Sequence, residues 1–134
     1  MNYLLDTDIC IYILNERDEK LRSRFLKHVS AQIAVSTLTE AELFYGAVHS
    51  ARPVQNRERV AAFLEPLTRI PFDSEAAVVF AVIKQELVTR GRVVGAIDML
   101  IAASALAKGY TLITNNEKYF QSVRGLAIEN WLRD

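Results

Sequence analysis

The sequence predicts a single α/β domain in which a parallel sheet is covered by helices on both faces. Short apolar segments alternate with longer helical segments, and the short segments are solid apolar runs rather than alternating ones. Solid runs are typical of strands buried on both faces, and strands that alternate with helices are typical of parallel sheets. Because no repeat, linker or low-complexity stretch divides the 134 residues, we expect one domain spanning residues 1–134.

The apolar segments, taken in chain order, give five strands with helices between them. We expect strands at residues 3–6, 32–36, 69–72, 110–114 and 126–131. We expect helices at residues 9–14, 16–28, 37–49, 57–67, 74–90 and 97–108, with a short helix within residues 115–123.

Residues that favour helix ends support these boundaries. The segment 6–8, Asp-Thr-Asp, consists of residue types that cap helix N-termini. Thr37 and Glu40 have the spacing of a capping box. Gly91 and Gly109 stand where two helices are expected to end.

The composition excludes several classes of protein. With 51% apolar and 24% charged residues, the chain has the composition of a globular protein. Its formal net charge of zero does not indicate a nucleic-acid binder. A polyanionic substrate would therefore need a local basic surface. No apolar run is long enough to span a membrane, and the N-terminus lacks the pattern of a secretory signal. Cys10 is the only cysteine, which excludes an intrachain disulfide and suits a reducing compartment. We therefore expect a cytoplasmic protein without a membrane partner.

Polar side chains follow two of the predicted strands. Asp6 ends the first strand, and Asn115 and Asn116 follow the fourth. In open α/β sheets the functional crevice lies at the carboxyl ends of the strands, where the strand order reverses. We expect these residues to face one another across that point.

Two further acids lie on apolar helix stripes. Glu42 shares a predicted helix face with Leu38 and Tyr45, and Asp98 stands in the first turn of a helix with apolar residues at i+3, i+4 and i+7. An acid on a buried stripe is costly unless it has a partner. Glu42 and Asp98 therefore need either water or a shared site.

Each acid has a simple explanation when it is taken alone. Asp6 and Asp8 could cap a helix, Glu42 could keep its head in water, and Asp98 could meet the positive end of a helix dipole. Taken together, Asp6, Glu42 and Asp98 suggest one shared pocket, in which their mutual repulsion would be relieved by a divalent cation. Oxygen donors favour Mg²⁺ or Mn²⁺ over zinc.

The two histidines do not belong to this pattern. His28 and His49 fit no metal-ligand spacing, and we expect both at the surface.

Four segments carry a resemblance to a known family. "LLDTDICIYIL" with Asp6, "STLTEAELFYGA" with Glu42, "VGAIDMLIAASALAKG" with Asp98 and "TLITNNEKYF" resemble the motifs of the PIN-domain ribonucleases. Within that family the chain is similar to the VapC toxins of bacterial toxin–antitoxin pairs over essentially its whole length. The resemblance implies a PIN-like three-layer α/β/α sandwich with a central, mainly parallel sheet. It also implies an endoribonuclease dependent on Mg²⁺ or Mn²⁺, usually dimeric and inhibited by a cognate VapB antitoxin, with tRNA as our expected substrate.

The resemblance also implies the site residues. Asp6, Glu42 and Asp98 match the family's three acids, and we expect them to be catalytic metal ligands. Where many members have a fourth acid, this chain has Asn116 with Glu117 beside it, which leaves open whether Asn116, Glu117 or neither contributes.

Side chains next to the acids are expected in supporting roles. Asp8 stands where the family often has Asn, and we expect it to orient Asp6 or the helix start. Thr7 and Thr114 flank the proposed site and could hydrogen-bond an acid or a phosphate, although each could equally be a cap.

Basic loop residues are the candidate RNA contacts, although such residues are more often plain solvated surface. The candidates are Arg52, Arg57, Arg59, Arg90, Arg92, Lys118 and Arg124. We select Arg90, Arg92 and Lys118, since the first two immediately precede the Asp98 segment. Phe44, Tyr45 and the helix from Ser74 could contact a second copy or an antitoxin, with core burial as the alternative.

Other classes of protein remain to be weighed. In a haloacid-dehalogenase-like phosphotransferase, Asp6 would be the nucleophile and Asp8 the general acid. Cys10 then stands where that family needs Thr or Val, and the late strand ends in two asparagines rather than acids. A metal-free ribonuclease would need a histidine near the acids. A non-catalytic module would leave Glu42 and Asp98 unexplained.

Overall fold

The computed structural model describes residues 2–16, 18–28 and 30–133. One five-stranded sheet has the order β3-β2-β1-β4-β5, and each neighbouring pair is parallel, which confirms the predicted parallel sheet. The strands are β1 Tyr3–Leu5, β2 Ile33–Ser36, β3 Thr68–Ile70, β4 Thr111–Ile113 and β5 Ile128–Glu129. The helices are α1 Thr7–Leu14, α2 Glu19–Lys27, α3 Thr37–Val48, α4 Pro53–Leu64, α5 Ser74–Thr89, α6 Ala96–Lys108 and α7 Glu117–Phe120, with a 3-10 turn at Ser30–Gln32.

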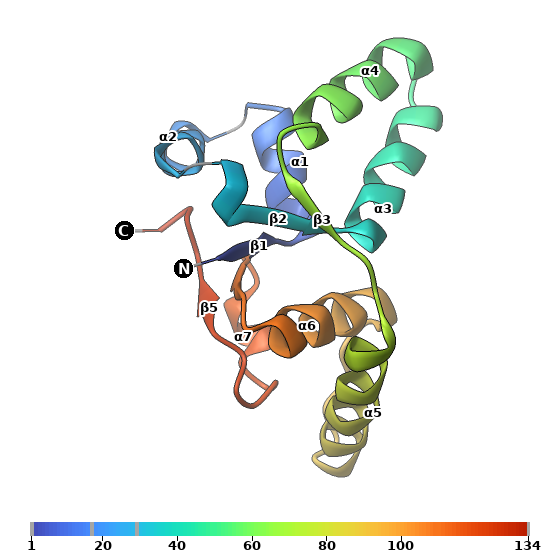
Figure 1. The fold of residues 1–134 in the computed structure, drawn as a ribbon, viewed down its shortest axis with the longest axis vertical. Helices are drawn as coiled ribbons and strands as arrows, with labels where there is room; N and C mark the ends of the chain where they lie inside the picture. Colours follow the sequence, from blue (N-terminus) through green and yellow to red (C-terminus); the bar gives the residue numbers. More distant parts are fainter. Residues whose placement is uncertain (1, 17, 29, 134) are drawn as a thin grey trace.

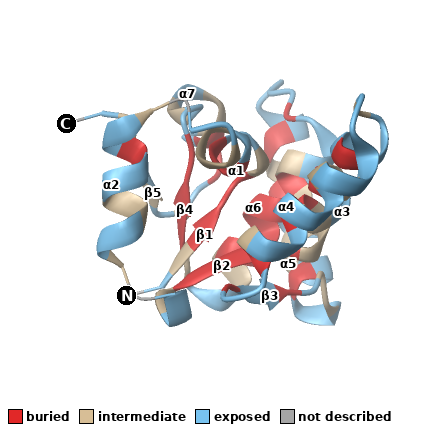
Figure 2. Cartoon of the chain, turned by 90° about the horizontal axis from the view of Figure 1, so that it is seen from above, coloured by how far each residue is buried: buried red, intermediate tan, exposed pale blue. Residues whose placement is uncertain are grey.

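Helices cover both faces of the sheet. In Figure 1 helices α1 to α4 lie on one side of the strands and α5 to α7 on the other. Leu4 and Leu112 belong to the core that includes α5 and α6, whereas Leu5 and Ile113 belong to the core that includes α1, α3 and α4. Successive strand residues thus point into different cores, which explains the solid apolar runs. Figure 2 shows the buried strands enclosed by helices with exposed outer faces. The three-layer α/β/α sandwich is confirmed.

Several predicted boundaries were wrong by a few residues. The third strand is Thr68–Ile70 instead of residues 69–72, and the last is only Ile128–Glu129. The helix predicted from Arg57 begins at Pro53, because the fixed φ of proline suits the first position of a helix. The helix predicted from residue 16 begins at Glu19, since the Asp18 side chain caps it by accepting from the Leu21 backbone N–H.

The predicted capping box at Thr37 is absent from this helix start. Ser36 is the N-cap of α3, and its hydroxyl accepts a hydrogen bond from the Leu38 backbone N–H at 3.0 Å. Thr37 is already the first helical residue. Glu40 instead reaches Arg69, with 3.6 Å between Oε2 and Nε. A serine directly before the threonine therefore moved the cap by one residue.

The strand order places a switch point between β1 and β4. The chain starts at β1 in the centre of the sheet, builds outward to β2 and β3, and then returns to place β4 on the other side of β1. Leu5 is in register with Ile113, and the Asp6 backbone N–H donates to the carbonyl of Ile113 at 3.0 Å. Asp6 and Thr114 therefore leave the sheet side by side, where ligands bind in open α/β folds.

No helix in the described part of the chain is long and apolar enough to cross a membrane.

Candidate acidic active site

Asp6 is a buried carboxylate at the end of the central strand. Only 5% of the residue is exposed. It is the N-cap of α1, and its Oδ1 accepts from the Ile9 backbone N–H at 2.8 Å. The fully buried Thr114 hydroxyl, at the end of β4, also hydrogen-bonds Asp6. The strand end and the cap together fix this carboxylate at the switch point.

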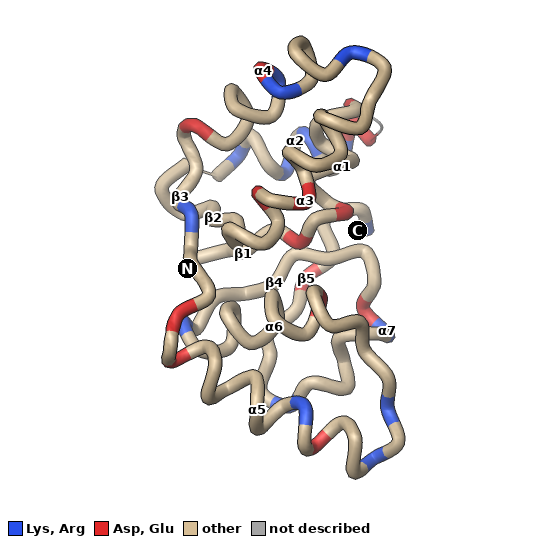
Figure 3. The backbone as a smooth tube through the Cα atoms, turned by 90° about the vertical axis from the view of Figure 1, so that its right-hand side faces the viewer, with Lys and Arg blue, Asp and Glu red and all other residues tan. Residues whose placement is uncertain are grey.

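Four acids line one open pocket of about 630 Å³. They are Asp6, Asp8, Glu42 and Asp98, and we call this hollow the acid pocket. They come from the end of β1, the first turns of α1 and α6, and the middle of α3. Figure 3 shows acidic segments near the middle of the molecule, whereas α4 and the far end of α5 carry basic ones. The structure thus brings together the three predicted ligands and Asp8.

The pKa values of two acids are raised by burial and, to a smaller extent, by the neighbouring acids. Burial is the main reason why the pKa of Asp6 is raised from 3.8 to about 6, and the charges of Asp8 and Asp98 raise it further, against the lowering effect of its hydrogen bonds. The pKa of Asp98 is also raised, first by burial and then by Glu42 and Asp8. The acids therefore share an electrostatic field that disfavours their joint ionisation.

Glu42 lies on the predicted helix face, beside Leu38 and Tyr45, but this face lines the acid pocket. The stripe is only partly buried, since Leu38 packs against the core that includes α5 and α6 whereas Tyr45 is 68% exposed. The buried face of α3 instead carries Thr39, Leu43 and Ala47. Glu42 is half-buried on the boundary.

The Glu42 carboxylate has a short hydrogen bond. The Thr7 hydroxyl donates to its Oε1 at 2.6 Å. Thr7 therefore orients a carboxylate in the pocket.

Asn116 and Glu117, which follow β4, lie in different surroundings. Asn116 is exposed, and its backbone N–H donates to the Thr114 hydroxyl at 3.0 Å. Glu117 accepts from Asn130 Nδ2 at 3.1 Å and lies 3.4 Å from Arg133 Nε. Neither Asn116 nor Glu117 lines the acid pocket.

The selected basic residues lie outside the pocket lining. Arg90 donates to the Ser122 carbonyl and pairs with Glu86 at 3.6 Å, so its guanidinium is already engaged. Arg92 and Lys118 are exposed.

The expectation for one histidine was wrong. His28 is half-buried, stacks on the Trp131 ring with 4.8 Å between centroids, and its Nδ1 bonds the Arg24 carbonyl at 2.8 Å. His49 is exposed, as expected, and stacks on Tyr45.

The donor set fits a hard divalent cation that keeps part of its water. Among residues 2–16, 18–28 and 30–133, no three His, Cys, Asp or Glu side chains lie close enough together to hold a metal ion by themselves. Mg²⁺ typically binds through one or two carboxylates and retains several waters, so acids arranged around an open hollow suit it better than they suit zinc. A cation would also offset the burial and, to a smaller extent, the repulsion that together raise the pKa values of Asp6 and Asp98.

Sequence reasoning missed two residues beside Asp98. Gly95 is the N-cap of α6, and its backbone N–H donates to the Tyr119 hydroxyl. A Cβ at Gly95 would lie 3.0 Å from that hydroxyl oxygen and 3.5 Å from Asp98 Oδ2. The one available signal was a glycine three residues before an acid at a helix start. Tyr119 gave none, because it reaches Gly95 from 24 residues away.

If the chain cleaves RNA as the resemblance implies, we expect Gly95→Ala to lower cleavage by about tenfold, because the methyl group would displace the Tyr119 hydroxyl at the start of the helix that carries Asp98 by a few tenths of an ångström. Steady-state cleavage by the purified variant measures the effect. In a Tyr119→Phe background, which lacks the crowded hydroxyl, the same alanine should cost less. An equal cost in both backgrounds would show that the contact with Tyr119 is not the cause.

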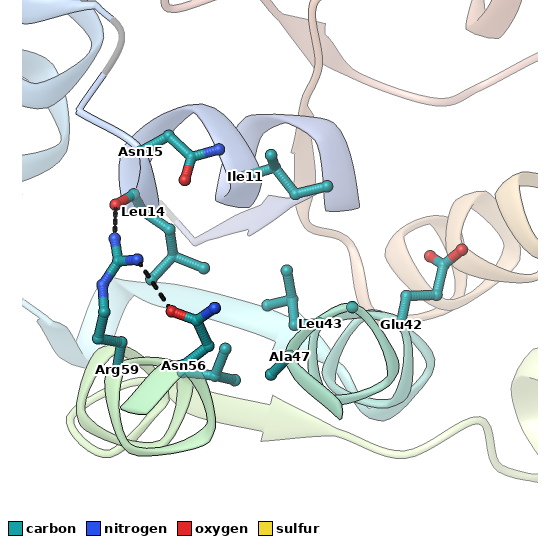
Figure 4. Close-up of a pocket in the computed structure, with 10 residues that line it drawn as sticks. Ile11, Leu14, Asn15, Glu42, Leu43, Ala47, Asn56 and Arg59 are labelled. Atoms are coloured by element: carbon teal, nitrogen blue, oxygen red, sulfur yellow. Dashed lines mark hydrogen bonds between the residues drawn. The ribbon is translucent and has the colours of Figure 1, made fainter. Parts of the chain in front are cut away.

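An apolar groove adjoins the acid pocket. It has a volume of about 210 Å³ and is bordered by α1, α3 and α4, with Ile11, Leu43 and Ala47 among its lining residues. Figure 4 shows Glu42 at one end and Arg59 at the other, where Arg59 donates to the Leu14 carbonyl. Ile11 and Glu42 line both the groove and the acid pocket, so the two hollows lie next to each other.

Comparison with known proteins gives consistent matches. Residues 3–126 match the PIN domain family. The chain is 38% identical over 132 residues to Ribonuclease VapC2 of Haemophilus influenzae, covering 98% of this chain and 99% of that protein. It is 34% identical over 131 residues to the tRNA(fMet)-specific endonuclease VapC of Salmonella typhimurium, covering 98% of each.

Solved structures agree with the sequence matches. VapBC2 from Rickettsia felis, bound to a DNA fragment from its promoter, superposes with a TM-score of 0.91 at 34% identity, covering 98% of this chain and 99% of that chain. DNA-bound VapBC from Salmonella typhimurium superposes with a TM-score of 0.92 at 34% identity, covering 98% of both chains.

The parallel sandwich, its acid pocket and the family match together define a PIN domain. Within that family the chain belongs to the VapC ribonucleases, as the nearly full-length identity to the Haemophilus and Salmonella proteins shows. The resemblance predicted from the four motifs is confirmed. The haloacid-dehalogenase-like alternative built on Asp6 and Asp8 is wrong.

Proposed function

We propose that residues 1–134 form a single PIN domain that acts in the cytoplasm as the toxin of a type II toxin–antitoxin system. Its reaction is the hydrolysis of RNA phosphodiester bonds, supported by Mg²⁺ or Mn²⁺. The observation that carries this proposal is the meeting of Asp6, Asp8, Glu42 and Asp98 in one pocket at the switch point. The Salmonella relative is named as specific for tRNA(fMet), which supports tRNA as the substrate class.

Asp6, Glu42 and Asp98 would hold the cation. When bound, it supplies Lewis-acid stabilisation of the phosphate and a water of lowered pKa. Asp6 is held for this role by Thr114 and the Ile9 N–H, and Glu42 by Thr7. The exposed Asp8 lies in the first turn of α1, where the helix dipole stabilises its charge and where it adds to the negative field of the pocket.

We propose that Asn116, rather than Glu117, contacts the RNA substrate at the site. The Glu117 carboxylate is engaged by Asn130 and Arg133, whereas the exposed Asn116 follows β4 next to the Asp6 partner Thr114. Arg92 and Lys118 are the selected basic residues that remain exposed for backbone phosphates, because Arg90 is held by Ser122 and Glu86.

The apolar groove is our proposed docking site for a VapB-type antitoxin. Because the groove shares Ile11 and Glu42 with the acid pocket, a segment that extends along it past these residues would obstruct RNA. The structural relatives named as VapBC complexes support such a partner.

A homodimer is proposed through the outer face of α5, where Val78 and Val82 are 67% and 62% exposed one helical turn apart.

Expression of the chain in bacteria without an antitoxin tests the function. We expect growth arrest, and the purified protein should cut tRNA with Mn²⁺ or Mg²⁺, leaving 5′-phosphate ends, and should stop in EDTA. A harmless chain that cuts no RNA with Mn²⁺ would overturn the nuclease proposal. Cleavage of messenger RNA but not of tRNA would overturn the substrate class alone.

A further inference from the structure

A chain of two hydroxyl groups ends on the Glu42 carboxylate. The Thr39 and Thr7 hydroxyl oxygens are 3.0 Å apart, and Thr7 lies 2.6 Å from Glu42 Oε1. Thr39 precedes Glu42 by three residues on α3, so both rise from neighbouring positions of one helix. Thr7 is the first residue of α1 and directly follows Asp6. The contact therefore joins the two elements that carry Asp6 and Glu42.

The direction of these hydrogen bonds follows from counting protons. An ionised carboxylate can only accept, and a threonine hydroxyl has one proton to give. The 2.6 Å separation is typical of a charge-assisted bond, so the Thr7 proton lies toward Glu42. The hydroxyl of Thr7 can then only accept from Thr39. Thr39 therefore donates to Thr7, and Thr7 donates to Glu42.

The burial of Thr39 shows that its hydroxyl depends on this contact. Thr39 is 0% exposed, so water does not satisfy its hydroxyl from outside. Within the described residues, its hydroxyl has Thr7 as its side-chain partner. A valine has nearly the same shape but lacks the hydroxyl donor, so Thr39→Val tests the hydrogen bond more than the packing.

We propose that Thr39 is a positioning residue, which orients the Glu42 carboxylate toward the acid pocket through Thr7. The inference rests on the proposed function, in which Glu42 is a metal ligand. Without the hydrogen bond from Thr39, the hydroxyl oxygen of Thr7 is no longer held in place. The Thr7 side chain is then free to rotate, which loosens its hydrogen bond to Glu42. The Glu42 carboxylate then samples orientations that point away from Asp6 and Asp98.

Mn²⁺ affinity of the purified protein tests this role directly. Titration followed by electron paramagnetic resonance of free Mn²⁺ gives the Kd without RNA. We expect Thr39→Val to weaken Mn²⁺ binding by about tenfold, the lower end of the effect of removing an outer hydrogen-bond partner of a metal ligand. Thr39→Ser, which keeps the hydroxyl, should restore the Kd to within about twofold. In cleavage assays with saturating RNA and subsaturating Mn²⁺, the Thr39→Val defect should shrink as Mn²⁺ is raised.

Two further variants make the outcomes unambiguous. Thr111→Val removes a buried hydroxyl on β4 outside the pocket, so its Mn²⁺ Kd should match that of the wild type. Thr7→Val breaks the same chain in the middle, so adding Thr39→Val to it should weaken Mn²⁺ binding no further. That comparison stays informative even if Thr39→Val lowers Tm.

The two hypotheses fail in different ways. A wild type that binds no Mn²⁺ and cuts no RNA would overturn the proposed function. A wild type that binds Mn²⁺, with an unchanged Kd in Thr39→Val or a fully additive loss in the double variant, would overturn the positioning role of Thr39 alone.

Discussion

Asp98→Asn is expected to abolish growth arrest and to lower RNA cleavage by at least about 10²-fold, the size of effect typical of losing one preorganised electrostatic contact. The substitution keeps the shape of the side chain and removes its charge from the acid pocket. Since Glu42 and Asp8 help to raise the pKa of Asp98, removing that charge relieves repulsion and the fold should survive. Single-turnover cleavage with Mn²⁺ measures the loss, and circular dichroism confirms the fold.

Glu75→Gln is the matched control for this variant. Glu75 is also a first-turn helix acid, at the start of α5, but it pairs with Lys108 instead of facing the acid pocket. Its replacement should leave cleavage unchanged.

Asp8→Asn tests the nuclease mechanism against a phosphotransferase mechanism in which Asp8 would be the general acid. Asp8 is exposed and is not one of the proposed metal ligands, so its loss should cost less than that of Asp98. The assignment of Asp98 fails if Asp98→Asn cuts RNA at the wild-type rate.

Asp6→Asn should make the metal-free fold more stable at neutral pH. Burial, with the charges of Asp8 and Asp98, raises the pKa of Asp6 from 3.8 to about 6 in the folded state. Between these pH values the folded chain holds a proton that the unfolded chain has released. The free energy of unfolding therefore falls as pH rises through this window. Above the window, the folded chain bears the full cost of keeping the Asp6 carboxylate ionised.

The expected gain follows from the size of that shift. About 2 pH units correspond to about 3 kcal/mol, and an asparagine that keeps the bond from the Ile9 N–H should recover on the order of 1–3 kcal/mol at pH 7.5. At pH 4 the gain should vanish, because Asp6 is then protonated in the folded wild type. Urea denaturation in EDTA at the two pH values gives both numbers. Added Mg²⁺ should stabilise the wild type more than the variant.

Asp73→Asn provides a control of opposite sign. Asp73 also caps a helix, accepting from the Ala76 N–H at 3.0 Å, but the hydrogen bond from Lys108 lowers its pKa. Its ionised form stabilises the fold, so the variant should be less stable than the wild type at pH 7.5. If Asp6→Asn is also destabilising at that pH, the penalty on the Asp6 carboxylate is smaller than the value of the bonds that it accepts.

Strand positions and strand-end acids could be predicted because they depend on local pattern. Two-sided burial makes each strand a solid apolar run, and Asp6 follows such a run directly. Asp98 could be predicted as a site residue because it shares one face of α6 with the buried residues Ile101, Ala102 and Ala105.

Other parts of the site depend on how helices pack and could not be predicted. The Thr7–Thr39 contact joins residues 32 apart, and Tyr119 meets Gly95 across 24 residues. The degree of burial of the stripe containing Leu38 could not be predicted, because a helix face beside an open pocket has the same apolar spacing as a face in the core. His28 was placed at the surface because its stacking partner, Trp131, lies near the other end of the chain.

The central position of β1 has a consequence for the timing of synthesis. β1 pairs on one side with β2, but its other neighbour, β4 (Thr111–Ile113), comes much later in the sequence. Until β4 is made, Asp6 lacks both the Ile113 carbonyl that accepts from its backbone N–H and its hydrogen bond with Thr114. A nascent chain that does not yet include β4 therefore cannot complete its acid pocket.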